Sequence, residues 1–272
     1  MEGMRGVLRS FVIAFSTYSK IPMPHLAWKE EDMRYSLCFF PLVGAVIGLL
    51  LWGFMFFAGW LGLGGISICL IGSILPLIVT GGIHLDGFMD VCDARHSYGE
   101  REKKLEILKD PHIGAFAVIQ TIVCAAVYVS GFSEILGLFN SQMALAGQEW
   151  QKSLAVFCCG FMLARVLSGL SLILLRPAKG NGMLAAFAGT ADKKVVQGVL
   201  LLELGITAGV MLGIDVRGGS LAVFAAVMSF WYYAYISKKE FGGITGDLAG
   251  FFVVVCETAM AVELGFGRIL FR

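Results

Sequence analysis

Long apolar segments constrain this chain more than any other feature. A helix of roughly 20 apolar residues crosses a bilayer. Seven stretches reach about that length, at residues 37–60, 66–88, 113–133, 153–175, 195–214, 219–237 and 246–266. Charged residues make up only 15% of the chain, against roughly 25% in soluble domains. We therefore predict an all-α, polytopic integral membrane protein, a helical bundle with about seven transmembrane helices.

The N-terminal stretch "MEGMRGVLRSFVIAFSTYSKIPMPH" combines basic residues with a short apolar run. That run is too short to span a bilayer, and no small-x-small cleavage site of a signal peptide follows it. We expect an interfacial or re-entrant helix here. Because no linker, low-complexity segment or convincing repeat interrupts the chain, we predict one membrane-embedded domain over residues 1–272.

The seven cysteines point to no metal or disulfide framework. Six lie in apolar segments, and the sequence contains no CxxC pair. Zinc sites and disulfide-rich folds have characteristic cysteine spacings that are missing here. We expect the cysteines to be small buried hydrophobic residues.

The distribution of Lys and Arg predicts the orientation in the membrane, because cytoplasmic loops collect these residues. The N-terminal segment and the second, fourth and sixth loops hold sixteen of them, and the opposite side holds four. We expect the N-terminus on the cytoplasmic side of a bacterial-type inner membrane and the C-terminus on the other side. The net charge of +1 gives no basic field that would attract nucleic acid.

Residues 81–116, "GGIHLDGFMDVCDARHSYGEREKKLEILKDPHIGAF", hold an unusual group of acids. In a helix, Asp86, Asp90 and Asp93 stand at i, i+4 and i+7, within about 60° of arc on one face. Like charges placed this way repel, and a divalent cation removes the repulsion. Mg²⁺ prefers carboxylate oxygens and often shares them with substrate phosphates. The alternative is a solvated helix end with ordinary acidic residues.

Further acids and bases fall near the same membrane side. "FGGITGDLAG" opens the seventh apolar segment and brings Thr245 and Asp247 to that side. Lys109 adjoins Asp110, and the basic loop "RPAKGNGMLAAF" contains Lys179. The candidate metal ligands are Asp86, Asp90, Asp93, Asp110 and Asp247, and the candidate catalytic residues are Asp90, Asp93 and Lys109.

Two charged residues lie deep in apolar segments, where charges are rare and face a cavity or a partner. Arg165 lies in the fourth segment and Glu257 in the seventh. Arg165 either binds a phosphate or pairs with Glu257, and the sequence favours neither. For His84, a polar cap or loop contact competes with a role in binding. The candidate substrate-binding residues are His84, Arg95, Arg165, Lys179, Thr245 and Glu257.

Acids that converge on one membrane side, with basic residues nearby, are typical of metal-assisted phosphoryl transfer. In such sites the acids hold metal ions, while the metal and Lys or Arg neutralise phosphates. An acid can also accept the proton of the attacking hydroxyl.

Several stretches resemble one known family. "GGIHLDGFMDVCDA", "LEILKDPHIGAF" and "GGITGDLAG" are similar to signature stretches of the cobalamin synthase, or adenosylcobinamide-GDP ribazoletransferase, family. "STYSKIPMP", "FFPLVGAVIG" and "AKGNGM" fit as well, so the resemblance covers nearly the whole chain. It implies a Mg²⁺-dependent membrane enzyme that joins α-ribazole, or its 5′-phosphate, to adenosylcobinamide-GDP and releases GMP. Adenosylcobalamin, or its phosphate, is the implied product.

The aspartate cluster also resembles, more loosely, the D-x2-D-G-x2-A-R motif of CDP-alcohol phosphotransferases. Here Asp86 and Asp90 are four residues apart, and Ala94 follows Asp93 where many cobalamin synthases have Gly. These departures leave the assignment of individual metal ligands open. A CDP-alcohol phosphotransferase of phospholipid synthesis is the first alternative function. A transporter is the second, because intramembrane Arg165 and Glu257 suit a substrate pathway. The oligomeric state and the identity of the general base stay open.

Overall fold

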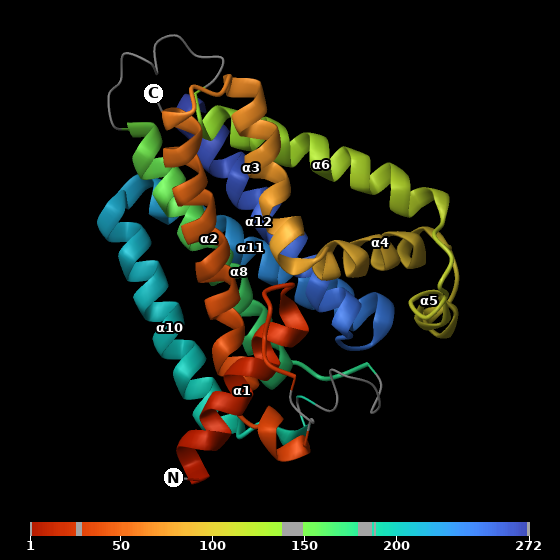
Figure 1. Cartoon of the computed structure of the whole chain (residues 1–272). Coiled ribbons are helices and arrows are strands. Elements are labelled where there is room, and N and C mark those ends of the chain that lie inside the picture. Colours follow the sequence, from red (N-terminus) through yellow and green to blue (C-terminus); the bar gives the residue numbers. More distant parts are fainter. Residues whose placement is uncertain (1, 26–28, 138–148, 179–186, 188, 271–272) are drawn as a thin grey trace.

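In the computed structural model the chain forms a bundle of helices (Figure 1). The structure describes residues 2–25, 29–137, 149–178, 187 and 189–270, and within these ranges it contains no β-strand. The elements are α1 (Glu2–Tyr18), η1 (Glu30–Met33), α2 (Ser36–Trp60), α3 (Gly65–Thr80), α4 (Ile83–His96), α5 (Arg101–Ile107), α6 (Ala115–Ile135), α8 (Glu149–Leu174), α10 (Lys193–Ile214), α11 (Val216–Ile236), η2 (Ser237–Phe241) and α12 (Gly246–Leu270).

Among the described residues, six helices are long and apolar enough to cross a membrane. They comprise α2, α6, α8, α10, α11 and α12. A seventh crossing is possible if α3 and α4 together form one bent span. The prediction of a polytopic, all-α membrane bundle is confirmed.

The predicted continuous span over residues 66–88 is wrong at its C-terminal end. Helix α3 stops at Thr80, and α4 continues after a bend of 93°. The bend is made by Gly81 and Gly82, whose φ angles are 66° and 81°. An L-residue pays about 1–2 kcal/mol in this left-handed region, whereas glycine enters it freely. Figure 1 shows α4 leaving the end of α3 sideways.

Helix α1 packs against α2 through aromatic side chains. The Tyr18 and Phe40 ring centroids are 4.3 Å apart, and those of Phe11 and Phe39 are 5.6 Å apart. After α1, the backbone N–H of Lys20 donates to the carbonyl oxygen of Val79 at 2.7 Å. The apolar part of α1, Gly6–Tyr18, is shorter than a membrane span. The end of α1 is thus fixed at the end of α3, beside the bend.

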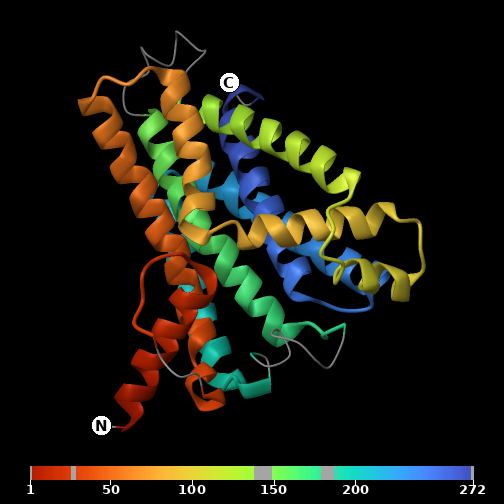
Figure 2. The ribbon, with the colours of Figure 1, turned by 45° about the vertical axis from the view of Figure 1, so that its right-hand side comes forward.

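Glycines let the central helices approach closely. Gly44 and Gly48 of α2 are four residues apart, and a Cβ on either would meet the backbone of α8 at Phe161 or Cys158. This is the small-xxx-small pattern that joins membrane helices. Helix α8 is the most buried of the six long helices. Figures 1 and 2 place the N- and C-termini at opposite ends of the bundle.

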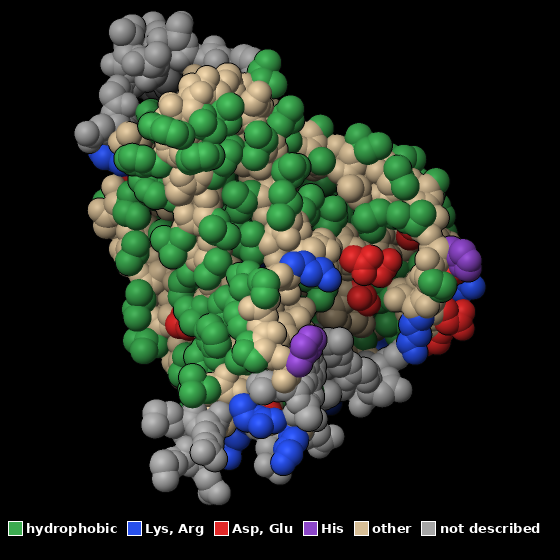
Figure 3. All heavy atoms as spheres, in the orientation of Figure 1, with side chains coloured by type: hydrophobic (Ala, Val, Ile, Leu, Met, Phe, Trp, Pro, Cys, Tyr) green, Lys and Arg blue, Asp and Glu red, His purple; other side chains and the backbone are tan. Residues whose placement is uncertain are grey.

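The outer surface of the bundle is apolar over wide areas, as the hydrophobic side chains in Figure 3 show. Phe56 and Trp60 of α2 are each 79% exposed. Such patches are rare on soluble monomers but match the hydrocarbon interior of a bilayer. The seven cysteines are free thiols, and five of them are buried.

Candidate active site between α4 and α12

Helices α4 and α12 meet at a glycine. A Cβ on Gly87 would lie 2.7 Å from the backbone oxygen of Asp247 and 2.8 Å from its Cα atom. A Cβ on Gly250 would lie 3.0 Å from the backbone oxygen of His84. Both views of the ribbon show α12 crossing α4 (Figures 1 and 2). The fold thus brings Asp247 against the aspartates of α4, although about 160 residues separate them in the chain.

The carboxylates at this crossing lack positive partners. Helix α4 is continuous over Asp86, Asp90 and Asp93, as the spacing predicts. The negative charges of Asp86, Asp247 and Asp93 all act on Asp90. Within the described part of the chain, no salt bridge involves Asp86, Asp90 or Asp247. Figure 3 shows acidic side chains gathered in one patch beside a hollow. Uncompensated acids of this kind favour binding of a cation.

Asp93 has a structural task that the sequence did not reveal. Its Oδ2 accepts a hydrogen bond from the backbone N–H of Gly114 at 2.6 Å, and Oδ1 accepts one from Ala117 at 2.8 Å. These are unpaired N–H groups at the start of α6, so Asp93 caps that helix from α4. To bind a metal ion or accept a proton, the Asp93 carboxylate would have to give up one of these capping hydrogen bonds.

Asp110 and Lys109 point to solvent rather than to the acidic patch. The backbone and the ring Nδ1 of His112 bond to Oδ1 of Asp110 at 3.0 and 2.7 Å. These hydrogen bonds lower the pKa of Asp110. The side chain of Lys109 is exposed. Neither residue lines the cavity beside Asp86.

A cavity of about 220 Å³ opens beside Asp86 and Asp247. Its walls combine the ends of α1 and α2 with α4, α8 and α12. His84 lines it and is 9% exposed, and its Nε2 has no hydrogen-bond partner among the described residues. The lining residues are Tyr18, Leu37, Phe40, Ile83, His84, Asp86, Ser168, Leu172, Phe187, Gly246, Asp247, Ala249 and Gly250.

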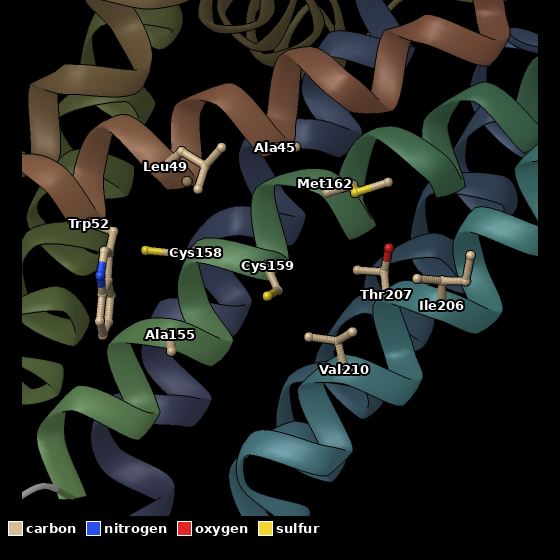
Figure 4. A pocket seen from close by; sticks show the side chains of 11 residues that line it. Ala45, Leu49, Trp52, Ala155, Cys158, Cys159, Met162, Ile206, Thr207 and Val210 are labelled. Atoms are coloured by element: carbon tan, nitrogen blue, oxygen red, sulfur yellow. The ribbon is translucent and has the colours of Figure 1, made fainter.

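A second hollow, larger than the cavity beside Asp86, is drawn in Figure 4. It has about 420 Å³ and lies between α2, α8 and α10. Trp52, Cys158, Cys159 and Met162 line it, and no charged side chain does. Because no charged side chain in its lining could hold a metal ion or neutralise a phosphate, this hollow is not a candidate active site.

The Arg95 side chain is bonded to two partners, Tyr232 on α11 and Glu240 on η2. Its Nη1 donates to the Tyr232 hydroxyl at 2.7 Å, and its Nε donates to Oε1 of Glu240 at 3.2 Å. Lys104 donates to the other oxygen of Glu240 at 2.7 Å. Two cations therefore share one carboxylate and join α4 and α5 to η2. Sequence analysis missed Glu240, Tyr232 and Lys104, and no sequence pattern marks them.

Arg165 and Glu257 form a buried ion pair. Nη1 of Arg165 donates to Oε1 of Glu257 at 2.7 Å and to the carbonyl oxygen of Phe161 at 2.8 Å. The Arg165 side chain is 1% exposed. Of the two interpretations that the sequence left open, the structure thus shows the ion pair, which joins α8 to α12.

The start of α12 is fixed by local bonds. The Thr245 hydroxyl accepts a hydrogen bond from the backbone N–H of Leu248 at 3.2 Å, which caps the helix. Ile244 exchanges backbone hydrogen bonds of 2.9 Å with Arg176 and Ala178. The first residues of the basic loop thus lie beside the acidic patch. Lys179, a predicted substrate-binding residue, is outside the described residues.

Lys20 is a cation near the site that sequence analysis overlooked. Its side chain lies over Gly81, where a Cβ would be 2.7 Å from Cγ of Lys20. Gly81 belongs to the α3–α4 bend and stands five residues before Asp86, so the Lys20 side chain lies at this bend. The stretch "STYSKIPMP" drew attention in the sequence, but nothing there indicated which other residues Lys20 would meet.

The donor chemistry of the acidic patch fits a hard divalent cation, but the side chains do not form a finished cage. Among the described residues, no three His, Cys, Asp or Glu side chains stand in an arrangement that would hold a metal ion. The carboxylates of Asp86, Asp90 and Asp247 would supply the oxygen ligands and the negative charge for such an ion. Binding would require them to turn toward a shared ion.

Replacing Gly87 with Ala is expected to lower kcat about tenfold or more. The new Cβ pushes the first turn of α12 away from α4, and misplacing a reacting group by about 1 Å can cost a hundredfold in rate. Gly53→Ala is the matched control, because nothing lies within 4 Å of a Cβ there. Steady-state kinetics of the purified variants check this. Equal rates for both variants would show that the crossing distance is unimportant.

The chain is similar to known proteins over nearly its whole length. Residues 10–265 match the protein family described as cobalamin-5-phosphate synthase. An adenosylcobinamide-GDP ribazoletransferase from Lachnoclostridium phytofermentans is 40% identical over 270 residues, which cover 97% of each chain. Proteins with the same name from Clostridium botulinum and Brevibacillus brevis are 30% and 31% identical, and the matches cover 93% and 94% of this chain and 96% of each relative. No solved structure matches the chain.

Proposed function

Because this chain belongs to the cobalamin-5-phosphate synthase family, we propose that it transfers α-ribazole, or its 5′-phosphate, to adenosylcobinamide-GDP and releases GMP. The chain is an enzyme of this family, and the transferase names of its relatives support ribazole transfer in cobalamin assembly. The product would be adenosylcobalamin or its 5′-phosphate. The supporting observation in the structure is the unpaired carboxylate face of α4 and α12, which borders a cavity.

Asp86, Asp90 and Asp247 are the residues proposed to hold Mg²⁺. Their charges repel one another without a cation, and no described basic side chain is paired with them. Bound Mg²⁺ would neutralise the pyrophosphate of the donor and the charge that develops on GMP. Asp93 would support this site indirectly by fixing α4 to α6.

The proposed reaction is a displacement at phosphorus. A ribose hydroxyl oxygen of α-ribazole forms a bond to the phosphorus that carries cobinamide. It is not the 5′-oxygen, because the 5′-phosphate of the acceptor would stay in place in the product. The bond from this phosphorus to the bridging oxygen of the pyrophosphate breaks, and GMP leaves with that oxygen and the bonding electrons. A carboxylate accepts the hydroxyl proton. Asp86 and Asp247 line the cavity and are the proposed acceptors.

Basic residues would assist at the leaving phosphate. Lys20 lies at the α3–α4 bend and projects over Gly81, so its ammonium group is the proposed contact for the phosphate of GMP. Lys and Arg stabilise phosphate charge that develops in the transition state. The distribution of Lys and Arg further supports a site on the cytoplasmic side of the inner membrane.

A competition assay separates this function from a phospholipid enzyme with the same acids. Purified protein in detergent receives Mg²⁺, α-ribazole, glycerol 3-phosphate, adenosylcobinamide-GDP and CDP-diacylglycerol together. We expect GMP and a cobalamin product, with no CMP. Release of CMP alone would establish a CDP-alcohol phosphotransferase instead. Uptake of a corrinoid into proteoliposomes without any product would favour a transporter.

A further inference from the structure

The cavity beside the acidic patch has aromatic walls. The rings of Tyr18 and Phe40 have centroids 4.3 Å apart, and the Phe187 ring lies 6.1 Å from that of Tyr18. The ring of His84 meets Phe40 at a centroid distance of 5.9 Å and an angle of 62°. Aromatic faces and edges arranged in this way favour a flat aromatic ligand.

A polar atom of His84, one of the residues that line this cavity, lacks a partner. Nε2 of His84 is buried and makes no hydrogen bond among the described residues, although buried polar groups are nearly always bonded. A neutral imidazole has one ring nitrogen that donates and one that accepts. The Ser168 hydroxyl lies in the same wall and is buried too. The cavity therefore offers one unused bond from His84, and a hydroxyl beside it, to a ligand that is otherwise apolar.

The volume of the cavity restricts which part of a substrate it can take. About 220 Å³ is below the roughly 300–1,000 Å³ of pockets that enclose a drug-sized ligand. A corrin ring or an entire nucleotide is excluded by size, whereas a single bicyclic base is not. Asp86 and Asp247 stand at the same cavity, so a sugar attached to that base would reach the carboxylates.

We propose that this cavity binds the base of the acceptor nucleoside, a flat bicyclic aromatic ring with one free ring nitrogen. His84 Nε2–H donates to that nitrogen, and the ribose places its attacking hydroxyl beside Asp86 and Asp247. This assignment rests on the proposed function, in which α-ribazole is the acceptor.

The guanine of the donor is the competing occupant, but its polar edge argues against it. Guanine carries several donors and acceptors along its edge, and buried polar groups need partners. The carboxylates of Asp86 and Asp247 also line the cavity, but in the proposed function they hold Mg²⁺. The remaining polar side chains, Tyr18, His84 and Ser168, do not suffice for the whole edge of guanine. A benzimidazole base has one free nitrogen and an otherwise apolar outline, which matches the cavity.

The first test measures KM for each substrate separately in His84→Phe and His84→Gln. Phe keeps a flat ring without the donor, and Gln restores an N–H near the position of Nε2. We expect His84→Phe to raise KM for α-ribazole about tenfold, with KM for adenosylcobinamide-GDP within twofold of wild type. His84→Gln should recover most of the loss. The control is His96→Phe, on the same helix but stacked on Phe116 away from the cavity.

The second test needs no turnover. Equilibrium dialysis measures binding of labelled α-ribazole to the wild type and to Ser168→Leu, which fills the cavity. Binding by the wild type and its loss in Ser168→Leu would support the assignment. Unchanged affinity in a folded Ser168→Leu protein, or a raised KM for adenosylcobinamide-GDP in place of α-ribazole, would overturn it. Absence of GMP release by the wild type would instead contradict the proposed function.

Discussion

Replacing Asp90 with Asn is expected to lower kcat by about a hundredfold to a thousandfold or more, without loss of folding. Removing one group that stabilises developing charge typically costs this much. The Asp90 carboxylate is repelled by the negative charges of Asp86, Asp93 and Asp247. Removing its charge therefore relieves repulsion in the protein without substrate or metal. The melting temperature in detergent should stay the same or rise. Turnover by GMP release and thermal unfolding, measured on one preparation, check both parts.

The matched control for Asp90→Asn is Glu106→Gln. Glu106 is an exposed acid on α5 that forms an ion pair with Lys103 at 3.5 Å, so the loss of its charge should change kcat by less than twofold. Asp247→Asn should behave like Asp90→Asn, because both acids belong to the same face. Near-normal turnover in Asp90→Asn would remove this residue from the proposed metal site.

Replacing Arg165 with Met is expected to destabilise the protein by about 3–5 kcal/mol, because it leaves the carboxylate of Glu257 buried without its partner. The pair joins α8 to α12 at 2.7 Å, with Arg165 1% exposed. Replacing both residues with Met should recover most of the loss, since two apolar side chains leave no buried charge. Equilibrium unfolding of the single and double variants in detergent measures both effects.

The control for the ion pair uses the same substitution on the surface. Arg34 bonds to Asp192 at 2.7 Å, but both side chains are solvent-accessible, and exposed pairs contribute little. Arg34→Met should therefore cause a much smaller loss than Arg165→Met. If Arg165→Met were as stable as the wild type, or if the double variant were the least stable, the ion pair would not be structural.

The long apolar segments were sufficient to predict the bundle, because a membrane span depends on length and composition more than on side-chain detail. The bend after Thr80 was not predicted. Hydropathy measures how apolar a segment is and contains no information on backbone φ angles. The left-handed conformations of Gly81 and Gly82 therefore could not be predicted, and both glycines were assigned to one continuous span. The bend positions the proposed site, because it turns α4 and its aspartates out of line with α3 and across α12.

The acidic face of α4 was predictable from the spacing of its aspartates. The proximity of Asp247 was predictable because its segment begins on the same side of the membrane. The tasks of single residues were not. Asp93 caps α6 because the backbone N–H groups of Gly114 and Ala117 donate to it. The spacing of residues within α4 cannot predict partners that come from another helix. Likewise, the aromatic walls around His84 come from three segments that only the tertiary fold brings together.

The most direct test of the account is GMP release from adenosylcobinamide-GDP by purified protein, with and without α-ribazole and Mg²⁺. If the carboxylates of α4 and α12 hold Mg²⁺ on the pyrophosphate, release will require both additions and will fall to background in Asp90→Asn. Release that continues without Mg²⁺ in chelator-treated protein, or that is unchanged in Asp90→Asn, would contradict this account.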